Sequence, residues 1–146
     1  MSEAPTTGDT LTGDVGPVAD LPFAPVQLQV RRARVSDAAD IARIMGHADV
    51  YPQTLQMPYA DEEAWRTRLT DTLAPGKTDL VLVGEISLNG GAPHVQGMAG
   101  LHPAGAQLRR RHVMSLGIAV HPDGKGMGLG WALLAALLDY ADRWAQ

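Results

Sequence analysis

Alternating apolar and polar residues over Val26–Ala33 predict the first strand of the chain. Ser36 is then expected to be the N-cap of a first helix, because acidic residues follow it in the next turn, where they complement the helix dipole. Apolar residues recur at helical spacing from Ile41 to Met45, and Gly46 is expected to end this helix. The first structured segment is therefore predicted to be a strand followed by a short helix.

The segment Asp49–Tyr59 contains two prolines and is predicted to be a loop. A second helix is expected over Asp61–Leu73, because Trp65, Leu69 and Leu73 share one helical face. A Pro-Gly pair directly after this segment is a strong signal for the end of the helix.

Three further strands are predicted, over Leu80–Glu85, His94–Leu101 and His112–Val120. The Asn-Gly-Gly turn at residues 89–91 lies between the first two of these strands and predicts a hairpin. A long helix follows near the end of the chain. Its wide apolar stripe consists of Leu129, Leu133, Leu137, Tyr140 and Trp144, widened by Leu134, Leu138 and Ala141.

The order of these elements is strand, helix, helix, three strands and helix. Two consecutive helices and a hairpin favour a mixed α/β (α+β) fold, with a largely antiparallel sheet flanked by helices, over a regularly alternating parallel fold. A wide apolar stripe on the last helix suits a helix that lies on a sheet.

Composition places the chain among soluble globular domains, with 146 residues, 45% hydrophobic residues and 19% charged residues. The absence of cysteine excludes disulfides, thiolate metal sites and a cysteine nucleophile, and it is compatible with the cytoplasm, where we expect the protein to be located. No apolar run is long enough to predict a membrane span, and no signal peptide is recognisable.

Charge divides the chain into two parts. Residues 1–24 carry four acidic groups and no Lys or Arg, show no period, and are predicted to be a flexible acidic tail. Residues 25–146 carry 12 basic and 12 acidic groups and are expected to form one domain, whose neutral charge argues against nucleic-acid binding. The basic cluster at 109–111 fits either a solvated turn or a phosphate contact.

A glycine-rich loop carries the clearest chemical signal. Glycines at positions 124, 126, 128 and 130 surround Lys125 between a predicted strand and a predicted helix. Such a loop can direct successive N–H groups at an anion, and the helix N-terminus adds its dipole. The pattern matches neither a P-loop nor a dinucleotide fingerprint. A phosphate site and a glycine turn without ligand both remain open from these residues alone.

In its strand–loop–helix context, the segment 116–134 resembles the acetyl-CoA-binding motif of the GCN5-related N-acetyltransferases (GNAT). Lys125 stands at the motif's usual Gln or Arg position, and Gly128 and Gly130 stand at its two small-residue positions. The resemblance implies an acetyl-CoA co-substrate whose pyrophosphate is held by the loop amides. The residues implied in cofactor binding are Leu116, Ile118, Val120, Lys125, Gly126, Met127, Gly128, Leu129 and Gly130.

The same resemblance implies that the strand edge at residues 116–120 binds the pantetheine arm as an added strand. It also implies that the backbone N–H of Ile118 polarises the thioester carbonyl, which a substrate amine attacks directly. A narrower resemblance, carried by residues 50–58, Trp65, residues 68–69 and residues 110–113, is to bacterial L-amino acid N-acetyltransferases. In this fold the first of these segments forms one wall of the acceptor pocket, so the expected acceptor-binding residues are Tyr51, Thr54, Gln56 and Met57.

Two departures from the family pattern affect the expected chemistry. Ser115 stands where many members have Glu or Asp to act on the amine proton, so His112 and Glu85 are the candidates for the base. Family members also continue beyond the long helix with a strand, a second helix and a hairpin. That second helix carries a Tyr that commonly protonates the leaving thiolate. The chain is therefore expected to be an incomplete domain, with slow or no turnover by itself.

The resulting hypothesis is acetyl transfer from acetyl-CoA to a small-molecule primary amine such as a free amino acid. Two alternatives remain open, a non-catalytic acyl-CoA-binding protein and an acetyltransferase acting on a protein N-terminus or lysine. Metal-ligand spacing is absent among His47, His94, His102 and His121, so no metal is expected. Neither nucleic acid nor membrane is an expected partner, and a homodimer remains open.

Overall fold

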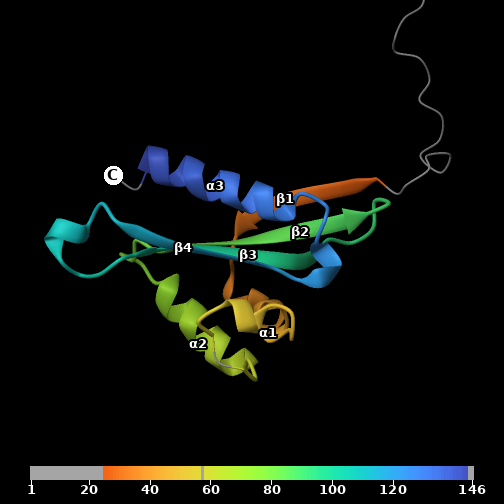
Figure 1. Cartoon of the computed structure of the whole chain (residues 1–146), viewed down its shortest axis with the longest axis horizontal. Helices are drawn as coiled ribbons and strands as arrows, with labels where there is room; N and C mark the ends of the chain where they lie inside the picture. Colours follow the sequence, from red (N-terminus) through yellow and green to blue (C-terminus); the bar gives the residue numbers. More distant parts are fainter. Residues whose placement is uncertain (1–24, 57, 145–146) are drawn as a thin grey trace, which may run out of the picture.

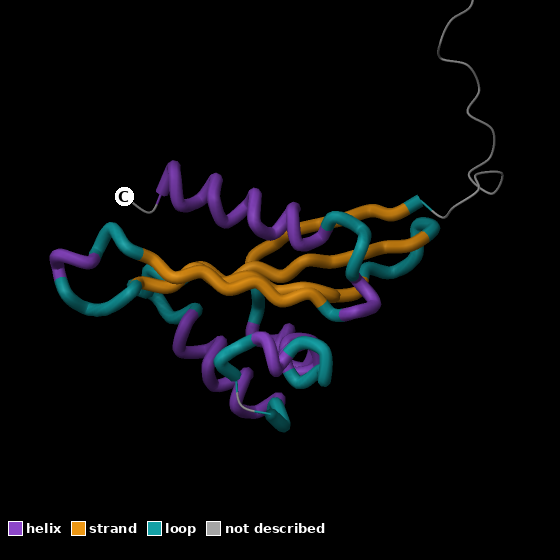
Figure 2. Tube along the Cα trace, in the orientation of Figure 1, coloured by secondary structure: helices purple, strands orange, loops and turns teal. Residues whose placement is uncertain are grey.

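The computed structural model describes residues 25–56 and 58–144. The predicted flexible tail, residues 1–24, and the predicted acceptor residue Met57 lie outside the described residues. Within these described residues the elements are four strands, three α-helices and short 3₁₀ turns, arranged as a sheet with helices on both faces (Figures 1 and 2). The predicted α+β class, with an antiparallel sheet flanked by helices, is confirmed.

The sheet is antiparallel throughout, with the strand order β1-β2-β3-β4. The strands are β1 (Val26–Arg32), β2 (Leu80–Leu88), β3 (His94–Pro103) and β4 (Met114–Val120). The predicted β2–β3 hairpin turns at Asn89 and Gly90, whose φ angles of 53° and 70° are those that a type I′ turn needs. Meandering connections place β4 at an edge of the sheet.

The two helices between β1 and β2 are α1 (Ala38–Met45) and α2 (Glu62–Thr72). Asp61 caps α2 by accepting a hydrogen bond from the Glu63 N–H at 3.1 Å. The expectation that Ser36 caps α1 is wrong. Ser36 lies inside a 3₁₀ turn, and the buried carboxylate of Asp37 instead accepts the Arg34 N–H at 2.7 Å.

Helices α1 and α2 cover one face of the sheet, and α3 (Leu129–Trp144) covers the other (Figure 1). Two cores result, since alternate residues of each strand point to opposite faces. On the sheet-facing side of α3, Leu129, Leu133 and Leu137 are fully buried, as the apolar stripe predicts. The stripe includes neither Leu138, which is 48% exposed, nor Trp144, which is 73% exposed, so these two parts of the prediction are wrong.

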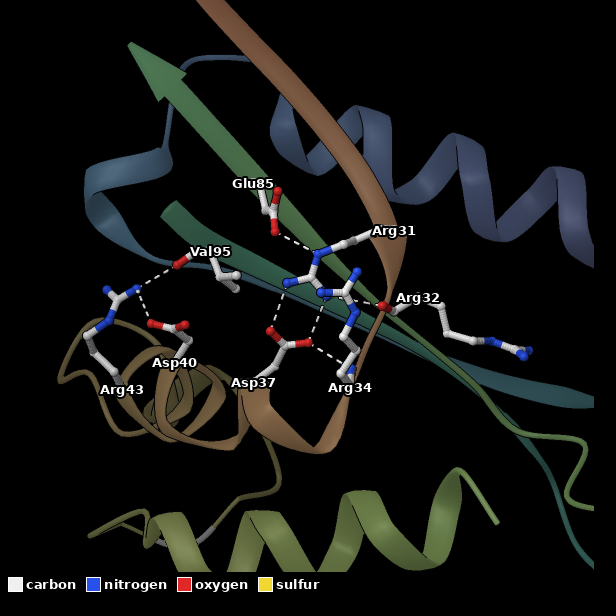
Figure 3. Close-up of polar contacts among 8 residues, drawn as sticks. All are labelled: Arg31, Arg32, Arg34, Asp37, Asp40, Arg43, Glu85 and Val95. Carbon is white, nitrogen blue, oxygen red and sulfur yellow. Dashed lines mark hydrogen bonds and ion pairs between the residues drawn. The ribbon is translucent and has the colours of Figure 1, made fainter. Parts of the chain in front are cut away.

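A part-buried charge network joins β1 to β2 and to the turn before α1 (Figure 3). The Arg31 guanidinium donates to Asp37 through two nitrogens, at 2.8 and 2.9 Å, and to Glu85 Oε1 at 2.6 Å. Burial disfavours the charge of Asp37, but the hydrogen bonds from Arg31 and Arg34 outweigh it and hold the pKa of this carboxyl below its usual range. This network fixes where α1 begins relative to the sheet.

Candidate active site

The glycine-rich loop connects β4 to α3 and takes a conformation that its glycines require. Gly126 and Gly128 have φ angles of 79° and 84°, in the left-handed region where a side chain is strained. Gly124 is buried, and a Cβ added there would lie 2.8 Å from the Cβ of Gln96 on β3. Lys125 is exposed beside them. The loop therefore packs closely on the sheet and presents backbone and one cation to solvent.

The N-terminus of α3 is anchored at this loop. Leu129, the first residue of the helix, is 1% exposed and lies against Gly84 of β2, where an added Cβ would be 2.5 Å from the leucine Cδ1. The first helical turn closes with the Ala132 N–H donating to the Gly128 carbonyl at 3.0 Å. The amides before Ala132 in this turn have no acceptor within the helix, and such a helix N-terminus is suited to binding an anion.

His121 links the start of the loop to β3 through hydrogen bonds. The ring Nδ1 of His121 accepts the Asp123 backbone N–H at 3.1 Å, and the backbone N–H of His121 donates to the Gln96 carbonyl at 2.7 Å. Burial lowers the pKa of His121, and the nearby charge of Arg43 lowers it further. The ring is therefore neutral near pH 7, as its role as a hydrogen-bond acceptor requires.

The direction of the β4 backbone follows from two hydrogen bonds to the β3 side. The His121 N–H donates to Gln96 O at 2.7 Å, and the Ala104 N–H donates to Val113 O at 3.0 Å. Hydrogen-bonded pairs recur at every second residue of an antiparallel ladder. Because the β3–β4 register is continuous between these points, the odd-numbered residues of β4 direct their N–H and C=O groups toward β3.

Leu116, Ile118 and Val120 are the even-numbered residues, and their N–H and C=O groups point away from β3. Among the described residues no strand pairs with this side of β4. The edge is therefore open to an extended ligand along the stretch that ends at the glycine loop. The residues proposed from the sequence for the thioester and the pyrophosphate thus lie along one continuous path.

A pocket of about 540 Å³ lies between the α1–α2 connection and the adjacent strands β3 and β4. Its floor includes Gly100 and Gly117, which face each other across the ladder and leave space that side chains would fill. Ser115 and Ile118 of β4 also line the pocket. The pocket therefore meets the open strand edge at Ile118.

The α1–α2 connection contributes Thr54 and Gln56 to the pocket lining. The Thr54 hydroxyl donates to the Tyr51 carbonyl at 3.0 Å and accepts the Gln56 N–H at 3.2 Å, so it shapes this wall. Tyr51 is half-buried but lies outside the pocket lining, and Met57 is outside the described residues.

Arg68 of α2 is a lining residue that sequence reasoning did not single out for a role. Its guanidinium carbon lies 4.8 Å from the Trp65 ring centroid, and its Nη1 donates to Gln56 Oε1 at 3.2 Å. A stack on Trp65 and a hydrogen bond to Gln56 hold a cation at the pocket wall. Of the residues that line this pocket, Arg68 and His102 are those that can carry positive charge.

The two candidate bases lie elsewhere. Glu85 is held by Arg31 in the network of Figure 3 and does not line the pocket. His112 is exposed and lines a second groove, of about 1230 Å³, between α3 and the β3–β4 connection. Neither is brought to the pocket that Ser115 lines.

A His–Asp pair at the pocket was missed by sequence reasoning. His102 of β3 lines the pocket, and its Nδ1 lies 2.7 Å from Oδ1 of Asp79, the residue before β2. The two residues are 23 positions apart in the chain, and only the hairpin register, which pairs Leu80 with Leu101, places them opposite each other. Extending the predicted hairpin by one residue beyond the Leu80–Leu101 pair would have placed Asp79 opposite His102.

Groups of three or more His, Cys, Asp or Glu that could hold a metal ion are not found within residues 25–56 and 58–144. In the same described part, no helix has the length and apolar character needed to cross a membrane.

Comparison with known proteins places this geometry in a family. The sequence model of the acetyltransferase (GNAT) family matches residues 44–146, which include the pocket, the β4 edge and the glycine loop. The chain belongs to the GNAT acetyltransferase family. The resemblance inferred from the loop motif is thereby confirmed.

Among individual GNAT proteins, an L-amino acid N-acetyltransferase of Escherichia coli is 30% identical over 126 residues, which cover 82% of this chain and 68% of the relative. A putative acetyltransferase from Salmonella typhimurium, solved with its cofactor acetyl-CoA, is 28% identical with a TM-score of 0.63, over 80% of this chain and 64% of that chain. A ribosomal-protein-alanine N-acetyltransferase from Brucella melitensis is 26% identical with a TM-score of 0.62, over 78% and 67%. This GNAT chain thus spans about two thirds of the length of these relatives.

Proposed function

We propose that this protein transfers an acetyl group from acetyl-CoA to the α-amine of a free amino acid. The observation that carries the proposal is the continuity of three features: the glycine-rich loop, the open β4 edge and the pocket that meets this edge at Ile118. The similar Salmonella typhimurium structure holds acetyl-CoA, which supports the same co-substrate here.

Acetyl-CoA fits this path from end to end. The amides from Gly126 to Gly130 would hold its pyrophosphate, with Lys125 adding positive charge. The pantetheine amides would pair with the β4 edge as an additional strand. The Ile118 N–H, which points away from β3, would donate to the thioester oxygen as negative charge develops there.

The pocket favours an acceptor that carries a carboxylate. Arg68 presents a guanidinium at the wall, and a guanidinium binds a carboxylate through paired hydrogen bonds. The name of the Escherichia coli relative, an L-amino acid N-acetyltransferase, supports the same class of acceptor. An acceptor of this kind would place its α-amine toward the β4 edge while Arg68 holds the carboxylate.

Ser115 favours a second candidate, a protein that binds acyl-CoA without turnover, because a hydroxyl is a poor base at the pocket. The test is thiol release from acetyl-CoA, measured with and without methionine or phenylalanine. Release that depends on the amino acid supports the proposed transfer. Calorimetric binding of acetyl-CoA with no thiol release for any amine would favour the non-catalytic binding protein. Thiol release with a peptide N-terminus alone would show that the acceptor is a protein N-terminus and not a free amino acid.

Thr54→Trp is expected to raise the acceptor KM at least about tenfold, which corresponds to about 1.4 kcal/mol of lost binding, while acetyl-CoA binding is unchanged. Thr54 lines the pocket wall, and an indole there would occupy acceptor space away from the glycine loop. Steady-state kinetics for the amino acid and calorimetry for acetyl-CoA measure the two effects separately. Ala48→Trp, on an exposed residue of the same connection that does not line the pocket, is the comparison variant for general damage to this segment. Unaltered acceptor kinetics in Thr54→Trp would remove Thr54 from the acceptor site.

A further inference from the structure

His102 and Asp79 form a pair that the acetyl-CoA path does not use. His102 Nδ1 lies 2.7 Å from Asp79 Oδ1, with the two side chains 35% and 23% exposed. The contact is a consequence of the β2–β3 register, because Leu80 pairs with Leu101 and the preceding and following residues therefore lie opposite each other. The pairing is built into the sheet rather than into a flexible loop.

This contact determines which nitrogen of His102 is free. A carboxylate accepts hydrogen bonds, so the neutral ring places its proton on Nδ1 and leaves the Nε2 lone pair available. Nε2 lies over Gly100, since a Cβ added to Gly100 would be 2.5 Å from it. Gly100 is part of the pocket floor, and the free nitrogen is therefore directed along that floor.

The register of β3 and β4 relates His102 to Ser115. The two residues are paired directly, and Gly100 is paired with Gly117 beside them. All four line the pocket, so they share one face of the sheet. The hydroxyl of Ser115 and the imidazole of His102 thus meet the same acceptor space, and the imidazole is the stronger base of the two.

We propose that His102, oriented by Asp79, is the general base for the acceptor amine; the inference rests on the proposed function. Nε2 takes one proton from the substrate ammonium, and the amine lone pair then forms the C–N bond to the thioester carbon. The C–S bond breaks and its electron pair leaves with sulfur. The second nitrogen-bound proton neutralises the thiolate, and the imidazolium releases the first to solvent. His102 is the catalytic residue, and Asp79 is a positioning residue.

The test compares His102→Asn with His94→Asn. An Asn side chain at 102 can still donate to Asp79 but has no basic nitrogen, while His94 lies on the same strand, exposed and outside the pocket. We expect His102→Asn to lower kcat about 10²–10³-fold, with unchanged KM for acetyl-CoA and unchanged melting temperature. We expect wild-type kinetics from His94→Asn. Asp79→Asn is expected to lower kcat by about tenfold to 10²-fold through loss of ring orientation.

The pH dependence of the rate distinguishes a general-base role of His102 from a purely structural one. Asp79 and Arg68 are the charged groups near His102, and His102→Asn changes neither of these two residues. The deficit of His102→Asn is expected to shrink as pH rises and the free amine itself becomes abundant. A deficit that is constant with pH, or equal losses in His94→Asn, would overturn the assignment.

A readout independent of turnover uses chains labelled with ¹⁵N-histidine. Adding methionine in the presence of CoA is expected to shift the Nε2 resonance of His102 and to leave that of His94 in place. An unshifted Nε2 would contradict contact with the acceptor. If the wild-type chain releases no thiol while Nε2 still shifts, the proposed activity fails and the acceptor contact of His102 stands.

Discussion

Asp37→Asn is expected to lower the free energy of unfolding by about 3 kcal/mol, the cost of breaking a buried ion pair from one side. The Asp37 side chain is 7% exposed and accepts hydrogen bonds from two nitrogens of Arg31 and from the Arg34 N–H (Figure 3). An amide at this position cannot accept all three, and the Arg31 charge remains part-buried with Glu85 alone. Urea unfolding followed by circular dichroism measures the loss.

Asp40→Asn is the matched control, because Asp40 is 46% exposed and its contact to Arg43 spans 3.6 Å. Exposed pairs of this kind contribute about 0–1 kcal/mol. The pKa of Asp37 is lowered in the fold, so its contribution is fully present above the unfolded-state pKa of about 3.9 and is lost as pH falls through the folded-state pKa. The gap between wild type and Asp37→Asn should therefore close in acid. Equal losses for the two variants at pH 7 would show that the network is not stabilising.

The parts of the fold that local sequence determines were predictable. The Asn-Gly turn, the start of the second helix at Asp61 and the Leu129–Leu137 stripe each depend on residues a few positions apart, and the structure has all three. Ser36 failed as a cap because a 3₁₀ turn over Val35–Asp37 precedes α1, and Asp37, the residue before the helix, is held by Arg31 and Arg34. The contact with Arg31 is tertiary, so the residues around Ser36 carry no sign of it.

The site divides in the same way. The glycine loop is contiguous in the sequence, and its strand–loop–helix context identified the family before any geometry was available. To identify the base, one must know which strand residues face the pocket, and this depends on the pairing register of the strands. Glu85 faces the charge network and His112 faces the other groove, whereas His102 reaches the pocket because β3 extends to Pro103, beyond the predicted end at Leu101.

Gly128→Val is expected to weaken acetyl-CoA binding at least about tenfold, which is about 1.4 kcal/mol. The φ angle of Gly128 is 84°, a conformation that a β-branched residue rarely adopts. A Cβ at this position has only one protein atom within 4 Å, Leu28 Cδ1 at 3.9 Å, so the protein itself leaves room for it. The expected loss of affinity therefore comes from a clash with the ligand, because a branched side chain would stand between the loop amides and the pyrophosphate.

Gly76→Val separates this effect from backbone strain. Gly76 follows α2 with a φ angle of 85°, and a Cβ added there would meet nothing within 4 Å. Both variants therefore carry a similar conformational cost, on the order of 1–2 kcal/mol, in an open loop. Calorimetry with acetyl-CoA should show the loss for Gly128→Val and wild-type affinity for Gly76→Val. If both folded variants bind equally well, the pyrophosphate does not lie on the amides around Gly128, and the cofactor path along β4 would have to end elsewhere.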